Sequence, residues 1–281
     1  MSVQVKPLRD VQGPSALGGG WRRSLDLLYL IAVTEFKRAY QGTVLGYLWS
    51  LCRPLLLFGV LYVVFTEALQ FGDSVRFYPA MLLFNLVLFG FFQEATGGAV
   101  TSIVAQEGIV RKTQFPRLVI PLAVVVTAFI NMSLNFIAVL GFMIASGVHI
   151  GLGWLGFPLI IGLLFLFTTA VSMIVSSLYP RYRDVSIIWT VLATALFYAT
   201  PVVYPLLIVP EGTLRQILAM NPLAPIFETA YVWMIDPSGI GPAEIAGGWA
   251  WLLIPAALYV ATCVFAVWIF LRQAPRIAED L

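Results

Sequence analysis

The chain has 281 residues, of which 60% are hydrophobic and only 11% are charged. Charged residues make up about 25% of an average soluble domain, so this chain has too few of them to cover a water-facing surface. Six membrane-spanning helices of about 20 residues need about 120 apolar residues, which the chain has to spare. The composition excludes a soluble enzyme, a nucleic-acid binder and a disordered protein. It predicts an all-α protein that crosses a membrane several times.

Residues that carry much of enzyme chemistry are scarce. His149 is the only histidine, and the two cysteines, Cys52 and Cys263, lie far apart in apolar stretches. We therefore expect no metal site, no disulfide and no Ser-His or Cys-His catalysis. The acidic residues are scattered rather than paired, which argues against an enzyme that transfers lipid-linked sugars. No filter-like sequence indicates a passive channel.

The first forty residues are predicted to stay outside the bilayer core. Residues 1–20 are polar and rich in Gly and Pro, without a cleavable signal pattern, and are expected to form a flexible cytoplasmic tail. Residues 21–40 have an amphipathic pattern, with Leu28, Ala32 and Phe36 on one side and Arg22 and Lys37 on the other. This pattern predicts an amphipathic interfacial helix along the inner membrane surface.

Charge-free gaps predict six membrane-spanning helices after this surface helix. The longest gap runs from Leu118 to Pro180 and is long enough for two helices joined by a Gly-rich connection. The six predicted spans cover residues 44–67, 78–104, 119–145, 154–178, 185–205 and 245–271. The stretch between the last two spans is apolar but interrupted by five prolines. We expect it to form two short re-entrant helices in the outer leaflet, with their free backbone groups buried against protein or water.

The basic residues predict the orientation of the chain. With six spans and a cytoplasmic N-terminus, fourteen of the sixteen Lys and Arg residues fall on the inner side, as the positive-inside rule requires. The two exceptions are Arg76 and Arg215. A five-span or seven-span chain would move a basic loop or the C-terminal residues 272–281 to the outside. Both termini are therefore expected in the cytoplasm.

Three stretches together carry a family resemblance. They are residues 41–56 (QGTVLGYLWSLCRPLL), 107–122 (EGIVRKTQFPRLVIPL) and 181–205 (RYRDVSIIWTVLATALFYATPVVYP). In order and spacing they resemble the permease subunit of type-2 ABC exporters, in the branch that moves lipid-linked polysaccharides such as O-antigen, teichoic acid or galactan. The resemblance covers nearly the whole chain after the tail. Arg53 departs from it, because the family more often has a neutral residue there.

The resemblance implies a function and a set of partners. It implies a homodimer in the bacterial cytoplasmic (inner) membrane, two separate ATPase subunits, and a polysaccharide carried on a polyprenyl diphosphate. The chain has no Gly-Lys pair and hence no phosphate-binding GxxxxGK[ST] loop. ATP and Mg²⁺ are therefore expected on the partner ATPase, with no cofactor on this chain. The alternative is an exporter of the same type that moves a small drug or a lipid.

Two cytoplasmic segments are candidate sites. The resemblance makes the loop after the second span a coupling helix that docks into the ATPase, although an ordinary positive-inside loop remains the alternative. Its candidate residues are Glu107, Arg111, Lys112, Phe115, Pro116 and Arg117. The inner mouth between spans four and five carries Arg181, Arg183 and Asp184. An acidic residue such as Asp184 stabilises the start of a helix, and it is also able to pair with either arginine. The sequence leaves two roles for this cluster equally open, a structural helix cap and a part in transport.

Aromatic residues of spans one and five are the candidates for a transport path, because their faces can stack on the apolar faces of sugar rings. In the resembled family these two spans line the channel. The candidates are Tyr47, Trp49, Phe58, Tyr62, Phe65, Phe197, Tyr198 and Tyr204. The competing interpretation is that such aromatics face lipid or neighbouring helices.

Glu94 is an acidic residue inside span two, where a charge is costly and therefore indicates function. The sequence allows it to be protonated or to face a cavity beside Gly97 and Gly98. Asn131 and Asn135, one turn apart in span three, are expected to join helices through hydrogen bonds.

Overall fold

The computed structural model describes residues 20–40, 46, 48–68, 75–108 and 117–273, and all the regular elements within these ranges are helical. Five segments in this part of the chain are long and apolar enough to cross a membrane. They are Leu48–Thr66, Tyr78–Ala105 (α4), Val119–Ala145 (α6), Leu152–Leu178 and Trp249–Gln273 (α12). A sixth apolar helix, α8 (Val185–Ala199), is shorter. The predicted all-α membrane fold is confirmed.

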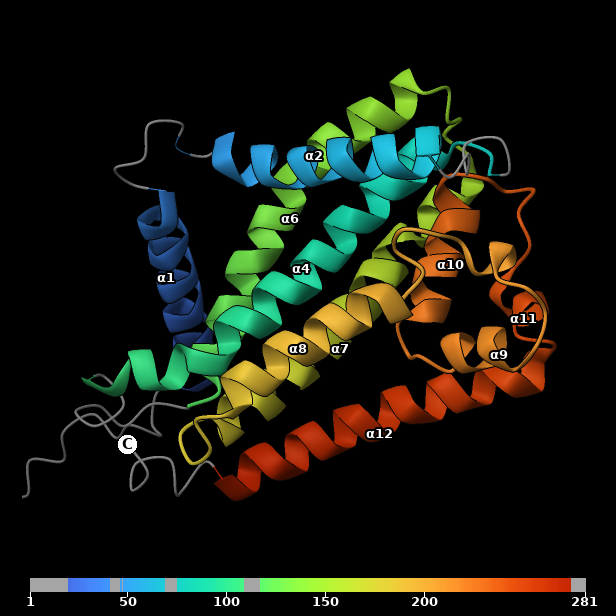
Figure 1. Cartoon of the computed structure of the whole chain (residues 1–281). Helices are drawn as coiled ribbons and strands as arrows, with labels where there is room; N and C mark the ends of the chain where they lie inside the picture. Colours follow the sequence, from blue (N-terminus) through green and yellow to red (C-terminus); the bar gives the residue numbers. More distant parts are fainter. Residues whose placement is uncertain (1–19, 41–45, 47, 69–74, 109–116, 274–281) are drawn as a thin grey trace, which may run out of the picture.

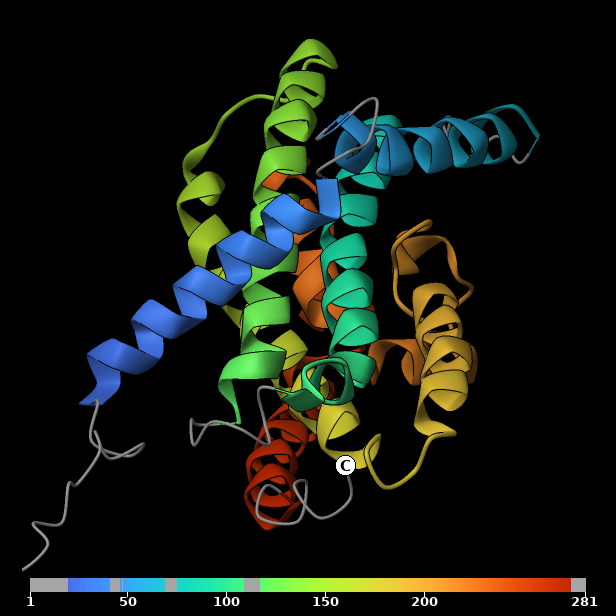
Figure 2. The same cartoon turned by 90° about the vertical axis from the view of Figure 1, so that its left-hand side faces the viewer.

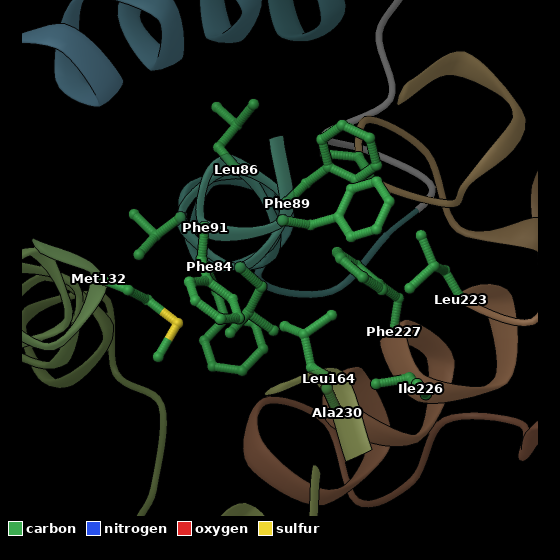
Figure 3. Packing of buried hydrophobic residues seen from close by; sticks show 14 of the residues in the cluster. Phe84, Leu86, Phe89, Phe91, Met132, Leu164, Leu223, Ile226, Phe227 and Ala230 are labelled. Atoms are coloured by element: carbon green, nitrogen blue, oxygen red, sulfur yellow. The ribbon is translucent and has the colours of Figure 1, made fainter. Parts of the chain in front are cut away.

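Helix α4 lies at the centre of the molecule (Figure 1). It packs against α6 on one side and against α7 (Phe157–Leu178) on another, and α7 in turn carries α12. Figure 3 shows Met132 of α6, Leu164 of α7 and Phe227 of α10 (Ala224–Met234) arranged around the α4 side chains Phe84 and Phe89. Nearly all of the N-terminal half of α4 is buried. The core is therefore an aromatic cluster built around one helix.

Helix α1 (Gly20–Tyr40) lies across α6 at a steep angle in both views (Figures 1 and 2). Ala32 is fully buried there, and the Thr127 hydroxyl of α6 donates a hydrogen bond to its carbonyl oxygen at 3.2 Å. Leu25 and Tyr29 are exposed. The side that packs on α6 therefore includes residues from the apolar side of the predicted surface helix, and some apolar side chains remain free for lipid.

Helix α2 (Leu48–Tyr62) continues through a π-helical turn, η1 (Val63–Ala68). It diverges from the central bundle, as Figure 2 shows, and none of its residues is buried. Its contacts with the rest of the chain are to α4 and α6. The first span is thus attached to the core along one side only.

The fifth predicted span, 185–205, is not helical throughout, because α8 ends at Ala199. Thr200 adopts an extended conformation, and Pro201 follows without a backbone N–H to donate into the helix. A 15-residue helix is about 22 Å long, short of the about 30 Å of a bilayer core. The sixth span also begins later than predicted, with α12 starting at Trp249 after the short helix α11 (Pro242–Ile245).

The backbone beyond the end of α8 is held by side chains of α4. The amide of Asn85 donates to the carbonyl oxygens of Pro201 at 3.0 Å and Val202 at 3.4 Å. The hydroxyl of Tyr78 donates to the carbonyl oxygen of Val203 at 2.8 Å. These bonds replace the helical hydrogen bonds that the prolines remove, as a broken helix within a membrane protein requires.

The segment between α8 and α12 returns into the bundle. It contains η3 (Leu206–Ile208), α9 (Thr213–Ala219), α10 and α11. The Phe227 ring of α10 lies 6.3 Å from the ring of Phe89, and Phe89 is about 16 Å along α4 from its first residue. Such depth is the geometry predicted for a re-entrant segment.

The turn η2 (Leu152–Gly156) packs closely against α10 of the re-entrant segment. A Cβ atom added at Gly153 would overlap the backbone of Trp233, and one added at Gly156 would overlap its indole ring. The indole N–H of Trp154 donates to the carbonyl oxygen of Met234 at 3.1 Å. The two glycines therefore permit an approach that any other residue would obstruct.

Candidate functional site

A cavity of about 810 Å³ opens between α2, α4, α6 and α8. It exists because α2 diverges from the bundle and leaves one face of α4 uncovered. The lining residues, from all four helices, are Trp49, Ser50, Arg53, Pro54, Leu56, Leu57, Leu86, Val87, Phe89, Gly90, Phe91, Gln93, Glu94, Met132, Asn135 and Phe197. Its walls combine apolar, aromatic and charged side chains, as ligand-binding cavities commonly do.

The polar part of the cavity wall lies on α4. Gln93, Glu94, Gly97 and Gly98 are the exposed residues in the middle of a helix whose other neighbouring positions are buried. Their spacing of three and four residues places them on one face. Of these four residues, Gln93 and Glu94 border the cavity, whereas a Cβ atom added at Gly98 would lie 2.9 Å from the side chain of Val124 in α6. The amide of Asn131 in α6 donates a hydrogen bond to the Glu94 carboxyl group and fixes its orientation.

Two further polar groups border the cavity from neighbouring helices. Arg53 lies in the N-terminal half of α2, borders the cavity and is exposed. Among the described residues no salt bridge joins Arg53 to Glu94. The side-chain oxygen of Asn135 in α6 is buried without a hydrogen-bond partner. The cavity wall therefore carries a cationic donor, Arg53, and an acidic group, Glu94, while the side-chain oxygen of Asn135 is buried beside it.

The structure separates the aromatic candidates into two groups. Trp49 and Phe197 both border the cavity, although they lie on different helices. Phe58 stacks on Tyr62 with 5.7 Å between ring centroids and meets Phe142 of α6 edge-on at 5.4 Å. Phe58 and Tyr62 therefore stack on each other, and the Phe58 ring also packs against α6.

The remaining aromatic candidates lie elsewhere. Phe65 is partly buried against the core, and Tyr198 is exposed next to Phe197. The hydroxyl of Tyr204 donates to the carbonyl oxygen of Tyr198 at 2.7 Å, so Tyr204 holds the end of α8. Tyr47 lies outside the described residues.

At the inner mouth, the arginines contact aromatic rings. The guanidinium of Arg183 lies 5.1 Å from the ring centre of Tyr179, and that of Arg181 lies 5.5 Å from the ring centre of Tyr182. Asp184 precedes α8 and accepts the N–H of Ile188 through its backbone carbonyl, while its side chain makes no capping hydrogen bond. In this part of the structure, neither pairing of Asp184 with an arginine is formed.

Only the two ends of the candidate docking loop are described. Glu107 and Arg117 are both partly exposed, and one guanidinium nitrogen of Arg117 is buried without a hydrogen-bond partner. The other candidates, Arg111, Lys112, Phe115 and Pro116, lie outside the described residues. Figure 1 places the ends of this loop, the 179–184 turn and the last residues of α12 at the same end of the bundle.

Four polar residues of the cavity were not candidates from the sequence: Ser50, Arg53, Gln93 and Asn135. For Gln93 the signal was present, since it neighbours Glu94 and precedes Gly97 by one turn. Nothing in the sequence brings Ser50 or Asn135 to the same cavity, because the divergence of α2 creates it. In the described part of the chain, no three His, Cys, Asp or Glu side chains come together as metal ligands would.

Comparison with known proteins places this chain in a family. Residues 26–235 match the ABC-2 type transporter family. The O-antigen export system permease protein RfbA of Myxococcus xanthus is 30% identical over 260 residues, which are 91% of this chain and 95% of that protein. A permease of the same name from Klebsiella pneumoniae is 31% identical over 200 residues, which are 71% of this chain and 76% of that protein.

The matched region runs from α1 to the end of α10 and includes every helix that borders the cavity. A permease of this family works with ATPase subunits in an ABC transporter. The chain therefore belongs to the ABC-2 type transporter family, as a multi-pass transporter subunit.

Proposed function

We propose that the chain is the membrane-spanning subunit of an ABC exporter that moves a polyprenyl-diphosphate-linked polysaccharide across the bacterial inner membrane. The observation that carries this proposal is the cavity between α2, α4, α6 and α8, where aromatic rings stand beside hydrogen-bonding side chains. A sugar polymer has both hydroxyl groups and apolar ring faces, and such a wall can contact both. The O-antigen export function named for the relatives from two organisms supports the same substrate class.

The transport path would be completed by a second copy of the chain. Along α8 only Ala193 is buried, and Ile187, Val191 and Tyr198 are exposed. Helix α2 has no buried residue. Two apolar helices with uncovered faces beside one cavity support a homodimer in which these faces meet and enclose the path. The exposed Tyr198 and the cavity residues Trp49 and Phe197 would then lie along it.

Two ATPase subunits would bind at the end of the bundle that carries Arg117, Arg181, Arg183 and Arg272 (Figure 1). This end would be cytoplasmic by the positive-inside rule, and both termini would then lie in the cytoplasm. The loop 107–117, with its basic residues Arg111 and Lys112 and its Phe115-Pro116 pair, would provide the docking contact. ATP and Mg²⁺ would bind to these ATPase subunits only.

Depletion of the chain in its own host tests the substrate class. Lipid-linked polysaccharide should accumulate on the cytoplasmic side while surface polysaccharide falls, as measured by immunoblotting of intact and lysed cells. The ATPase encoded with the chain should co-purify with it. Unchanged surface polysaccharide would reject the assignment, and a loss of drug resistance or of lipid export alone would favour the alternative exporter.

A further inference from the structure

We propose that Glu228 and Arg215 form a proton-sensitive switch in the re-entrant segment, in which ionisation of Glu228 makes Arg215 exchange Glu211 for Glu228. The two residues belong to α10 and α9, which Figure 1 shows with α11 at the end of the bundle away from the 179–184 turn. The switch would set how the end of α8 is held. The inference goes beyond the proposed function and rests on it only for the side of the membrane that this end faces.

Glu228 is a carboxyl group inside the protein, with little around it to stabilise an ionised state. Its side chain is 3% exposed, and the hydrogen bond that it accepts comes from the N–H of Leu206 at 2.8 Å. An ionised carboxylate has sites for about four hydrogen bonds, and a buried charge is costly unless it is paired. Within the described part of the chain, no salt bridge includes Glu228. The contacts as they stand therefore suit the uncharged form.

Arg215 is the buried cation beside this carboxyl group. It is 8% exposed, and its Nε atom is buried without a hydrogen-bond partner. It pairs with Glu211 at 3.6 Å, but the side chain of Glu211 is 95% exposed, and ion pairs that water reaches are weak. An ionised Glu228 would offer the Nε–H a buried, charged acceptor, which forms a stronger hydrogen bond than a neutral one. Ionisation of Glu228 would therefore draw Arg215 away from Glu211.

The other elements around α10 bring few competing charges. Helix α7 and the turns η2 and η3 contain no titratable residue. The titratable or charged groups on or next to α10 itself, α4 and α11 are Tyr78, Glu94, Arg76, Tyr231, Asp236 and Glu244. Asp236 pairs with Arg76 at 3.8 Å, and Glu244 is exposed. Among the residues that the structure describes, Arg215 is therefore the cation available to an ionised Glu228.

Hydrogen bonds connect this pair to the end of α8. Asn221, in the joint between α9 and α10, donates to the hydroxyl of Thr200 at 2.8 Å and to the carbonyl oxygen of Ala199 at 3.3 Å. Glu228 itself holds the N–H at the start of η3. A movement of α9 toward α10 would therefore reach the end of α8 through Asn221, and α8 borders the large cavity through Phe197.

The direction of the switch follows from the pKa of Glu228. Burial raises this pKa to about 7, while the N–H of Leu206 and the charge of Arg215 act in the opposite direction. Below that pH the carboxyl group is uncharged and Arg215 keeps Glu211. Above it the carboxylate draws Arg215 and α9 inwards and accepts the Leu206 N–H more strongly. On the outer side of a membrane, the hold on the end of α8 would thus depend on the external pH.

The test uses the full-length chain in lipid nanodiscs from about pH 5 to about pH 9. Infrared difference spectra measure the protonated carboxyl group, and amide hydrogen exchange, corrected for its intrinsic pH dependence, measures the Leu206 N–H and α9. The carboxyl band should disappear with a midpoint near pH 7. Over the same range, protection of the Leu206 N–H should rise about fivefold, and α9 should gain protection as well. Glu228→Gln should abolish all three changes.

Two further variants test the exchange of partners. Arg215→Gln removes the cation and should raise the midpoint by about one pH unit. Glu211→Gln releases Arg215 from its exposed partner and should lower the midpoint. The matched control is Glu244→Gln, at an exposed position of α11, which should keep the wild-type midpoint. An unchanged midpoint in Glu211→Gln, or an α9 whose protection does not follow the titration, would show that Arg215 does not change partners.

Circular dichroism and gel filtration check that each variant is folded. If Glu228→Gln does not fold, Arg215→Gln and Glu211→Gln still decide, because their expected shifts have opposite signs. A wild-type chain without a titrating carboxyl band near pH 7 would overturn the switch. These measurements require neither polysaccharide nor ATPase, so their failure would leave the proposed substrate to be judged by the depletion experiment alone.

Discussion

Helices α4 and α2 are both predicted spans, yet they occupy opposite environments. The mean hydropathy is 1.9 over Leu48–Thr66 and only 1.3 over the most apolar part of α4. The less apolar helix is nonetheless the buried one, and the more apolar helix has no buried residue along Leu48–Tyr62. Hydropathy in a membrane protein therefore does not identify the core.

The buried helix is not the most apolar one because these helices are surrounded by lipid rather than by water. Lipid tails are as apolar as Leu, so burial of an apolar helix in protein gains little from the hydrophobic effect, and polar groups and close packing decide which helix is central. Helix α4 has Tyr78 and Asn85, which donate hydrogen bonds to residues 201–203, and Thr96, whose hydroxyl accepts one from the indole N–H of Trp189 in α8. The predictions below use matched substitutions at well-packed and open positions to test this contrast.

The largest effect is expected for a leucine of α4. Leu83 is 1% exposed, whereas Leu56 of α2 is 65% exposed. Leu83→Ala should lower the free energy of unfolding by about 2 to 5 kcal/mol, because the cavity left behind cannot collapse fully. Leu56→Ala should lower it by less than about 0.5 kcal/mol. Chemical unfolding in detergent micelles measures both, and equal losses would remove the distinction between the two helices.

A second pair compares two asparagines. Asn85→Leu leaves the carbonyl oxygens of Pro201 and Val202 without their donor, at a cost of about 3 kcal/mol for two unsatisfied groups. Asn135→Leu removes an amide oxygen that has no partner and should change stability by under about 1 kcal/mol. Thermal unfolding of the purified chains tests this. A loss for Asn135→Leu as large as for Asn85→Leu would contradict the role given to the Asn85 amide.

A third pair compares two glycines. A Cβ at Gly156 would overlap the indole of Trp233, whereas one at Gly162 would have no neighbour within 4 Å. Gly156→Ala should cost about 2 kcal/mol through overpacking, and Gly162→Ala should gain up to about 1 kcal/mol from helix propensity. The same unfolding assay measures both the loss of stability in Gly156→Ala and the gain in Gly162→Ala. Adding Trp233→Leu to Gly156→Ala should restore part of the loss, and failure to do so would place the strain elsewhere.

The smallest effect is a pH dependence at Glu228 in α10. Burial raises the pKa of Glu228 from 4.5 to about 7, while the N–H of Leu206 and the charge of Arg215 act in the opposite direction. Since the folded chain holds this proton more tightly than the unfolded chain, the contribution of Glu228 to stability is complete below pH 4.5 and is lost as the pH rises through about 7.

Glu228→Gln keeps the acceptor for the Leu206 N–H but removes the titration. Its melting temperature should therefore fall less between pH 5 and pH 8 than that of the wild type. Glu244→Gln, at an exposed position of α11, should show the same change of melting temperature with pH as the wild type. If the melting temperature of Glu228→Gln changes with pH as much as that of the wild type, a group other than Glu228 causes the pH dependence.

Much of the fold follows from local patterns in the sequence. Charge-free gaps place four of the spans, because a helix that crosses lipid has few residues able to bear a charge. The prolines after Thr200 indicate a break, and Glu94 beside Gly97 indicates a cavity or a protonated group. Each of these inferences uses residues within a few turns of one another.

The remainder depends on contacts between distant segments. Nothing marks Asn85 as the partner of Pro201, 116 residues away, since an asparagine in a span is equally able to bond to any neighbouring helix. The prolines indicate that the helix breaks near residue 200, but they do not show what holds the extended segment that follows Ala199, because its partners lie on α4. The cavity depends on the angle of α2, which no periodicity in residues 44–67 encodes.

The hydrogen bonds from α4 to residues 201–203 have a consequence for how the chain enters the membrane. Synthesis proceeds from the N-terminus, so Tyr78 and Asn85 are already in the bilayer when residues 201–203 leave the ribosome. The extended segment, whose bare carbonyl groups lipid would reject, thus finds its donors in place. Moving α4 to a later position in the chain, by circular permutation, would require this segment to wait in lipid with its carbonyl groups unsatisfied. The order of helices in the sequence is therefore also an order of assembly.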